Sequence, residues 1–203
     1  MLPDKIHMQK KVSQVTKAGF FSIQVHRGQI RKPSGQKYIT HPIMVAKILR
    51  DYGNNYVSIL KRSIKGRYLL RNKKRIFQAA LLHDTKESNP ESFKELSRRF
   101  DKKTVSIVQE LSNDKVVMNQ VSTAVYLTNK INNMSSEALL IKLVDRLCYV
   151  LEMKSAKKAK PEWLNPAVEE TRHIIKGIKK RVSQETQLHK ALYSLIKKEV
   201  SNL

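Results

Sequence analysis

Apolar residues recur at helical intervals along almost the whole chain. Val45, Ile48, Leu49 and Tyr52 fall at positions i, i+3, i+4 and i+7, and Pro42 precedes them as a first-turn residue. Hairpin signals between alternating runs are absent. The pattern therefore predicts an all-α protein, a bundle of about eight or more helices in a single domain over residues 1–203. Comparable stripes predict the remaining helices around Ile76–His83, Phe93–Phe100, Val105–Leu111, Val117–Val125, Leu140–Leu151, Thr171–Ile178 and Leu188–Ile196.

Two basic segments interrupt this periodicity. The first runs from His26 to Tyr38, with Pro33 and Gly35 at its turn, and it reads as a loop. The second runs from Gly53 to Arg75 and contains a dense Lys and Arg cluster without an acidic residue between Lys61 and Arg75. We expect this segment to be a loop as well.

The net charge narrows the classes of partner. The chain has 40 Lys and Arg against 17 Asp and Glu, a formal net charge of +23. Such a surface attracts phosphate-bearing molecules, although a basic run is more often only a solvated face. Phosphorylated nucleotides are therefore expected partners, and nucleic acid is a less favoured alternative.

The remaining composition points to a soluble, cytoplasmic protein. The chain begins without an apolar leader and contains no run of about twenty apolar residues, so neither a secretory signal nor a membrane partner is expected. The only cysteine, Cys148, leaves no internal disulfide and agrees with a reducing compartment. His7 and His189 lie among polar residues and read as structural.

The adjacent pair His83-Asp84 is the first candidate for chemistry. It ends an apolar helical run, and neighbouring side chains on a helix point about 100° apart, so both can reach a metal beside the helix end. A buried carboxylate beside a buried imidazole is costly unless something compensates. A divalent cation compensates by accepting the imidazole nitrogen and the carboxylate oxygen together.

His41 and Asp145 extend this set. His41 stands at the start of the helix that follows the first basic segment, and Asp145 lies inside an apolar helical run. An alternative pairs Asp145 only with neighbouring Lys142 or Arg146. The full order, His followed by His-Asp and then Asp, matches the ligand pattern of HD-domain phosphohydrolases.

Three segments resemble the hydrolase domain of RelA/SpoT-type alarmone enzymes. They are His26 to Pro42, Ala79 to Glu87, and Lys142 to Leu147, and their order and spacing agree with the family. The C-terminal stretch is similar to the tail of the small, stand-alone hydrolases, which include a metazoan form. The resemblance therefore covers nearly the whole chain and implies an HD-domain fold.

The resemblance also implies a reaction. His41, His83, Asp84 and Asp145 would bind one manganese ion or another divalent metal, and a bound water would attack phosphorus. Glu87 would position that water or handle its proton. The implied reaction removes the 3′-pyrophosphate of (p)ppGpp and gives GDP or GTP, so an alarmone synthetase would be its functional counterpart.

The nucleotide side of the site is implied in the same way. Arg31, Lys32 and Ser34 match loop positions that line the family's nucleotide site. Ser88 replaces the second acid of the family's His-Asp-x-x-Glu-Asp motif, so we include it among the catalytic positions. Tyr149 lies where the family carries polar nucleotide contacts, and we expect it to contact substrate.

These departures keep two alternatives open. The same metal chemistry could act on another phosphorylated nucleotide, such as ppApp or NADPH. A degenerate HD protein could instead bind nucleotide or nucleic acid through its basic surface.

Overall fold

The computed structural model describes residues 13–31, 34–156 and 162–203. These residues form successive helices, and within them the only strand-like pairing is one bridge between Ile30 and Lys37. The all-α prediction is confirmed. The helices are α1 (Gln14–Val25), α2 (Thr40–Asn55), α3 (Val57–Leu60), α4 (Ile64–Arg71), α5 (Lys73–Leu82), α6 (Thr85–Ser88), α7 (Ser92–Arg99), α8 (Lys102–Leu111), α9 (Lys115–Gln120), α10 (Thr123–Asn132), α11 (Ser136–Ala156), α12 (Leu164–Ser183) and α13 (Gln187–Ser201).

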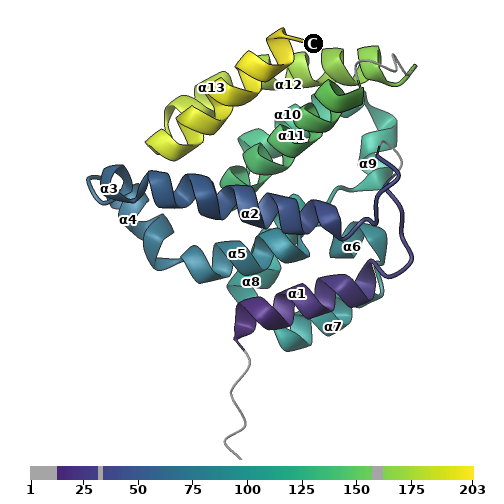
Figure 1. Ribbon diagram of the computed structural model, residues 1–203, viewed down its shortest axis with the longest axis vertical. Coiled ribbons are helices and arrows are strands. Elements are labelled where there is room, and N and C mark those ends of the chain that lie inside the picture. The colour runs from purple at the N-terminus through teal and green to yellow at the C-terminus, as the bar shows by residue number, and fades with distance from the viewer. Residues whose placement is uncertain (1–12, 32–33, 157–161) are drawn as a thin grey trace, which may run out of the picture.

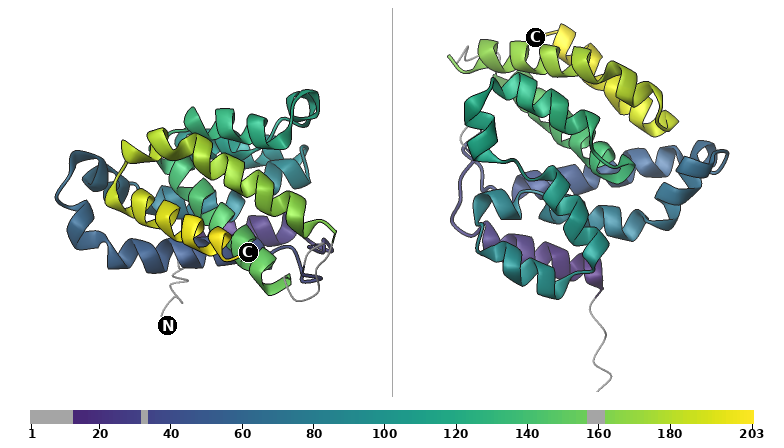
Figure 2. Two further views of the ribbon diagram at one scale, coloured as in Figure 1. Left: turned by 90° about the horizontal axis from the view of Figure 1, so that it is seen from above. Right: turned by 180° about the vertical axis from the view of Figure 1, so that it is seen from behind.

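Helix α11 runs through the middle of the bundle. It packs against α2, α5 and α8 on one side and against α12 and α13 on the other (Figure 1). Leu139, Ile141 and Leu147 on this helix are fully buried, and each such burial contributes about 1.5–3 kcal/mol. Figure 2 shows α12 and α13 covering the end of the molecule opposite to α1 and α7.

Side-chain caps fix where several helices begin. The side chains of Ser13, Ser63, Asp101, Asp114 and Ser122 accept hydrogen bonds from backbone N–H groups in the first turns of α1, α4, α8, α9 and α10. A cap of this kind contributes about 1 kcal/mol because it satisfies a donor that the helix itself cannot.

The prediction of a loop from Gly53 to Arg75 is wrong. Helix α2 continues to Asn55, two short helices follow, and α5 begins at Lys73. Leu60 and Leu69 are each 3% exposed, so this segment has an apolar face. The many Lys and Arg residues between them make that face hard to recognise in the sequence. Gly66 allows the close approach, because a Cβ there would lie 2.1 Å from the carbonyl oxygen of Leu60.

The stripe expected over Val117–Val125 is also not one helix. Helix α9 ends at Gln120, and Ser122 caps the separate helix α10. Val117 and Val121 are exposed rather than buried. These valines have the spacing of a helical face, but no part of the core packs against them.

None of the described helices combines the length and apolar character that crossing a bilayer requires. The arrangement that matters for function is the contact between α2, α5 and α11. Each of these helices brings one part of the His and Asp set to the same place.

Candidate metal centre

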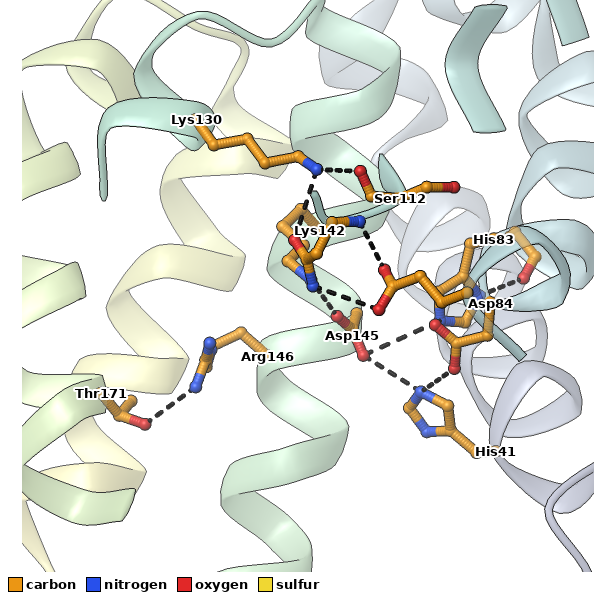
Figure 3. Close-up of polar contacts among 12 residues, drawn as sticks. His41, His83, Asp84, Ser112, Lys130, Lys142, Asp145, Arg146 and Thr171 are labelled. Carbon is orange, nitrogen blue, oxygen red and sulfur yellow. Dashed lines mark hydrogen bonds and ion pairs between the residues drawn. The ribbon is translucent and has the colours of Figure 1, made fainter. Parts of the chain in front are cut away.

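Four side chains from three helices converge at one point. His41 is the second residue of α2, His83 and Asp84 follow directly after α5, and Asp145 lies midway along α11. Figure 3 shows the two imidazoles and the two carboxylates facing one another. His41 and His83 are 5% and 2% exposed, so the cluster is shielded by the packing of the helices.

Each of the two histidines lies within 4 Å of both carboxylates. The Nε2 atom of His41 lies 3.1 Å from Asp145 Oδ1 and 3.6 Å from Asp84 Oδ2. The Nε2 atom of His83 lies 3.2 Å from Asp84 Oδ1 and 3.9 Å from Asp145 Oδ1. One ligand atom each from His41, His83 and Asp145 fits within 4.8 Å, which is compact enough for a single divalent cation.

The buried Nε2 atom of His83 is the observation that fits a metal best. His83 Nδ1 lies 2.8 Å from the carbonyl oxygen of Ala80, which can only accept, so Nδ1 carries the proton. In the neutral ring, Nε2 then presents a lone pair, and it makes no hydrogen bond although it is fully buried. Carboxylate oxygens face it, and a cation between these atoms would remove the repulsion. Two imidazoles and two carboxylates suit a divalent transition metal.

Each carboxylate has one oxygen held by a neighbouring donor. The hydroxyl of Tyr38 donates to Asp84 Oδ2 at 2.8 Å, and the ammonium of Lys142 donates to Asp145 Oδ2 at 2.8 Å. Such partners orient metal ligands and raise their affinity. The sequence left open whether Asp145 pairs with Lys142 or lies beside the histidines. The structure shows that Asp145 does both. Arg146, the other expected partner, contacts Glu170 and Thr171 instead.

The electrostatics keep both carboxylates ionised. Burial raises the pKa of Asp145, but Lys142 and His41 outweigh it, and the net pKa lies well below the usual range. The pKa of Asp84 is also lowered: burial opposes ionisation, but the positive charge that His83 and His41 carry when they are protonated outweighs it. A site that retains two anions in a buried position is prepared for a cation.

Comparison with known proteins agrees with this geometry. A family model described as HD domain matches residues 18–182. The chain belongs to the HD-domain family. Its resemblance to the small alarmone hydrolases is also confirmed, because such proteins are among its relatives.

Two relatives and one solved structure illustrate the likeness. The guanosine-3′,5′-bis(diphosphate) 3′-pyrophosphohydrolase MESH1 of Homo sapiens is 29% identical, covering 94% of this chain and 97% of that protein. The protein of the same name from Danio rerio is 30% identical, covering 78% and 81%. The structure titled "A metazoan ortholog of SpoT hydrolyzes ppGpp and plays a role in starvation responses" superposes with a TM-score of 0.68 at 18% identity. It covers 95% of this chain and 98% of that one. This last likeness establishes the HD-domain fold alone.

The first basic segment of the HD domain is held against the metal centre. The ring of His26 stacks on Tyr38 with 4.8 Å between centroids, and Arg31 lies over the same ring at 5.7 Å. Gly28 and Gly35 have φ of 78° and 67°, a left-handed conformation that favours glycine. The expected loop is therefore present, and it is anchored to Asp84 through Tyr38.

The expected nucleotide contacts are dispersed. Arg31 forms two hydrogen bonds with Glu152 at 2.5 and 2.7 Å, and this pairing raises the pKa of Arg31 although burial opposes it. Ser34 lines a cavity of about 240 Å³ beside His41, and Glu152 lines the same cavity. Lys32 lies outside the described residues. Tyr149 packs against the guanidinium of Arg146 at 5.3 Å.

Glu87 lies three residues beyond Asp84, and its carboxylate is held by the turn after α8. Its carboxylate accepts from the backbone N–H of Asn113 at 2.7 Å and from the Asn113 side chain at 3.3 Å. Lys130 donates to the carbonyl of Ser112 and to Asn113 Oδ1 in this turn. Burial, reinforced by the charge of Lys142, lowers the pKa of Lys130 to about 8.

Sequence reasoning did not identify Tyr38, Asn113, Lys130 or Glu152 as partners in the site. Tyr38 offered a weak signal, since it stands within the first motif. The others lie outside any motif, and only the fold brings them to the centre. Ser88 ends α6 beside Glu87, and its backbone N–H donates to the carbonyl of Asp84.

Proposed function

We propose that this protein is a metal-dependent hydrolase that removes the 3′-pyrophosphate of (p)ppGpp, giving GDP or GTP and pyrophosphate. The observation that carries the proposal is the buried set of two imidazoles and two carboxylates, with the Nε2 atom of His83 lacking a hydrogen bond. Relatives that cover 94% and 78% of this chain carry the same activity in their names. A single HD-type domain over residues 1–203 belongs to this proposal.

In the proposed centre, His41, His83, Asp84 and Asp145 hold one manganese ion. A divalent metal supplies Lewis-acid activation, lowering the pKa of water and stabilising charge that develops on phosphate oxygens. The chain's own task is to keep both carboxylates ionised and correctly turned. Tyr38 and Lys142 perform that task by each occupying the second oxygen of one carboxylate.

Glu87 is the proposed proton-handling residue. It is separated from Asp84 by less than one helical turn. Its carboxylate is held by Asn113, so it does not have to serve as a metal ligand. It can therefore orient a water for attack on phosphorus and accept its proton. Ser88 stands where an acid would otherwise assist, so the proton path depends on Glu87.

The nucleotide is proposed to enter along the first basic segment. Ser34 contacts it from the cavity beside His41, and Arg31 and Lys32 supply positive charge near its phosphates. Tyr149 is the proposed contact from α11. Losing Arg31 should raise KM more than it lowers kcat, because phosphate contacts distant from the scissile bond act similarly in ground and transition states.

One observation supports a second substrate. Glu152, an acid, lies in the cavity next to Ser34 and engages Arg31. A carboxylate can accept from an exocyclic amine of either guanine or adenine, so ppApp or NADPH is the alternative substrate for the same centre. In either case the proposed location is the cytoplasm. An alarmone synthetase, which would make the nucleotide that this protein degrades, is its proposed functional counterpart.

The deciding experiment combines metal analysis with turnover. Chelator-treated protein should bind about one equivalent of manganese and then release pyrophosphate from ppGpp, whereas Asp84→Asn should lose both properties. Parallel reactions with ppApp and NADPH rank the substrates. Ser88→Asp should raise turnover if the missing acid limits the rate. Manganese-loaded protein that hydrolyses none of the three nucleotides would overturn the proposal.

A further inference from the structure

A second cavity lies at the far end of α2 from the metal centre. Its volume is about 350 Å³, and residues of α2, α3, α4, α5, α11 and α13 line it. From His41 to Gly53 the helix spans about 18 Å, at 1.5 Å per residue. Figure 1 shows α3 and α4 at this end of α2 and α6 near the other end. The two sites are therefore separate.

The wall of this cavity is apolar. Leu49, Leu60, Leu69, Ile76 and Leu188 line it, and each is at most 4% exposed. Its volume and apolar wall match small-molecule pockets, which begin at about 300 Å³. An aliphatic chain placed against such a wall leaves water, and each methylene so buried tightens binding about fourfold.

Cations border the same cavity. Arg50, Lys61 and Lys73 are exposed residues that line it, and no Asp or Glu does. Arg50 is paired with Asp51 at 3.1 Å, but the ammonium groups of Lys61 and Lys73 have no hydrogen-bond or ion-pair partner among the described residues. Apolar walls with unpaired cations complement a molecule that has an aliphatic tail and an anionic head.

We propose that this cavity binds a monomeric single-chain amphiphile with a carboxylate head. The tail lies among the leucines, and the head contacts Lys61 and Lys73. This binding goes beyond the proposed hydrolysis and does not depend on it, since none of the residues assigned to the metal centre lines the cavity.

Gly53 offers a direct way to block the cavity. It lines the space, and a Cβ added to it would meet nothing within 4 Å. Gly53→Leu should therefore place its side chain in the cavity, and leucine suits a helix better than glycine, so the variant should fold. Gly19→Leu is the matched control, because Gly19 is also helical with open space beyond it but does not line the cavity.

The test is calorimetric titration of the full chain with octanoate, decanoate, decanol and decyltrimethylammonium. Decanoate should bind at one equivalent, about 16-fold more tightly than octanoate because it has two more methylenes. Decanol should bind more weakly, and the cationic amphiphile should not bind. Gly53→Leu should abolish decanoate binding, whereas Gly19→Leu should retain it. The double variant Lys61→Gln/Lys73→Gln should weaken binding of decanoate but not of decanol.

Other outcomes overturn the proposal. One is decanoate binding that Gly53→Leu leaves unchanged or that ignores chain length. Another is binding to vesicles of anionic phospholipid with no binding of monomeric decanoate, which would assign the cations to a membrane surface. Asp84→Asn should bind decanoate normally, so failure of the hydrolase proposal is distinguishable from failure of this one.

Discussion

Replacing Tyr38 with Phe removes one hydroxyl and leaves the ring in place. The ring should keep its stacking on His26 and its contact with Arg31, so the first basic segment should retain its path. What disappears is the 2.8 Å hydrogen bond to Asp84 Oδ2. The substitution therefore tests whether a donor outside the ligand set supports the proposed metal centre.

The expected loss can be estimated in two ways. A hydrogen bond to a charged group contributes about 1.5–3 kcal/mol, which corresponds to roughly 10- to 160-fold in affinity. Partners of metal ligands typically contribute about 10- to 100-fold. We therefore expect the Kd for Mn²⁺ to rise about 10- to 100-fold. The hydroxyl also helps to lower the pKa of Asp84, so the deficit should grow as the pH falls and Asp84 begins to take up a proton.

The measurement is calorimetric titration of chelator-treated protein with Mn²⁺ at several pH values. Tyr193→Phe is the matched control, because that hydroxyl donates to the carbonyl of Ile175 at 3.1 Å, away from the centre. Circular dichroism should show the same helix content in both variants. A Kd for Tyr38→Phe within twofold of the parent value would refute the reasoning, and so would an equal loss in Tyr193→Phe.

Three further predictions concern catalysis, packing and pH. Glu87→Gln should keep its metal by elemental analysis while turnover falls about 10²–10⁴-fold, and undiminished turnover would contradict its role. Gly66→Ala should lower the free energy of unfolding in urea by about 1–3 kcal/mol because its Cβ would strike the carbonyl of Leu60. Gly19→Ala, with open space, should instead raise it by about 0.5–1 kcal/mol. Burial lowers the pKa of His189, so the unfolded chain binds that proton more readily, and stability should fall as the pH drops below about 6.5. His189→Gln should show a smaller fall over the same range, and an unchanged pH dependence would exclude this cause.

Sequence periodicity predicted best the helices that cover the core on one face. Helix α12 is the clearest case, since Thr171, Ile174, Ile175 and Ile178 mark a stripe that the structure buries while the residues between them are exposed. Periodicity failed between Gly53 and Arg75, where cations are as numerous as apolar residues and the helices are short. The burial of His189, which was read only as structural, was missed for a related reason. Lys190 follows it directly in the sequence, yet His189 is fully buried and its Nε2 lies 2.9 Å from the carbonyl oxygen of Ser136.

The proposed metal ligands could be predicted from the sequence, whereas the residues that hydrogen-bond to the carboxylates of the site could not. His41, His83, Asp84 and Asp145 could be proposed together because a metal restricts its ligands to a few residue types, and a resemblance supplied their order. The structure brings all four to one point. Their partners obey no such restriction, since a phenol, an amide or an ammonium can each hold a carboxylate.

Sequence distance explains why those partners were missed. Tyr38 and Asp84 are 46 residues apart, Glu87 and Asn113 are 26 apart, and the pair formed by Arg31 spans 121. Helical spacing relates residues three or four positions apart and carries no information over such lengths. Only the packing of the fold brings these residues together. The proposed role of Arg31 and Glu152 in substrate choice therefore has to be tested on the folded protein.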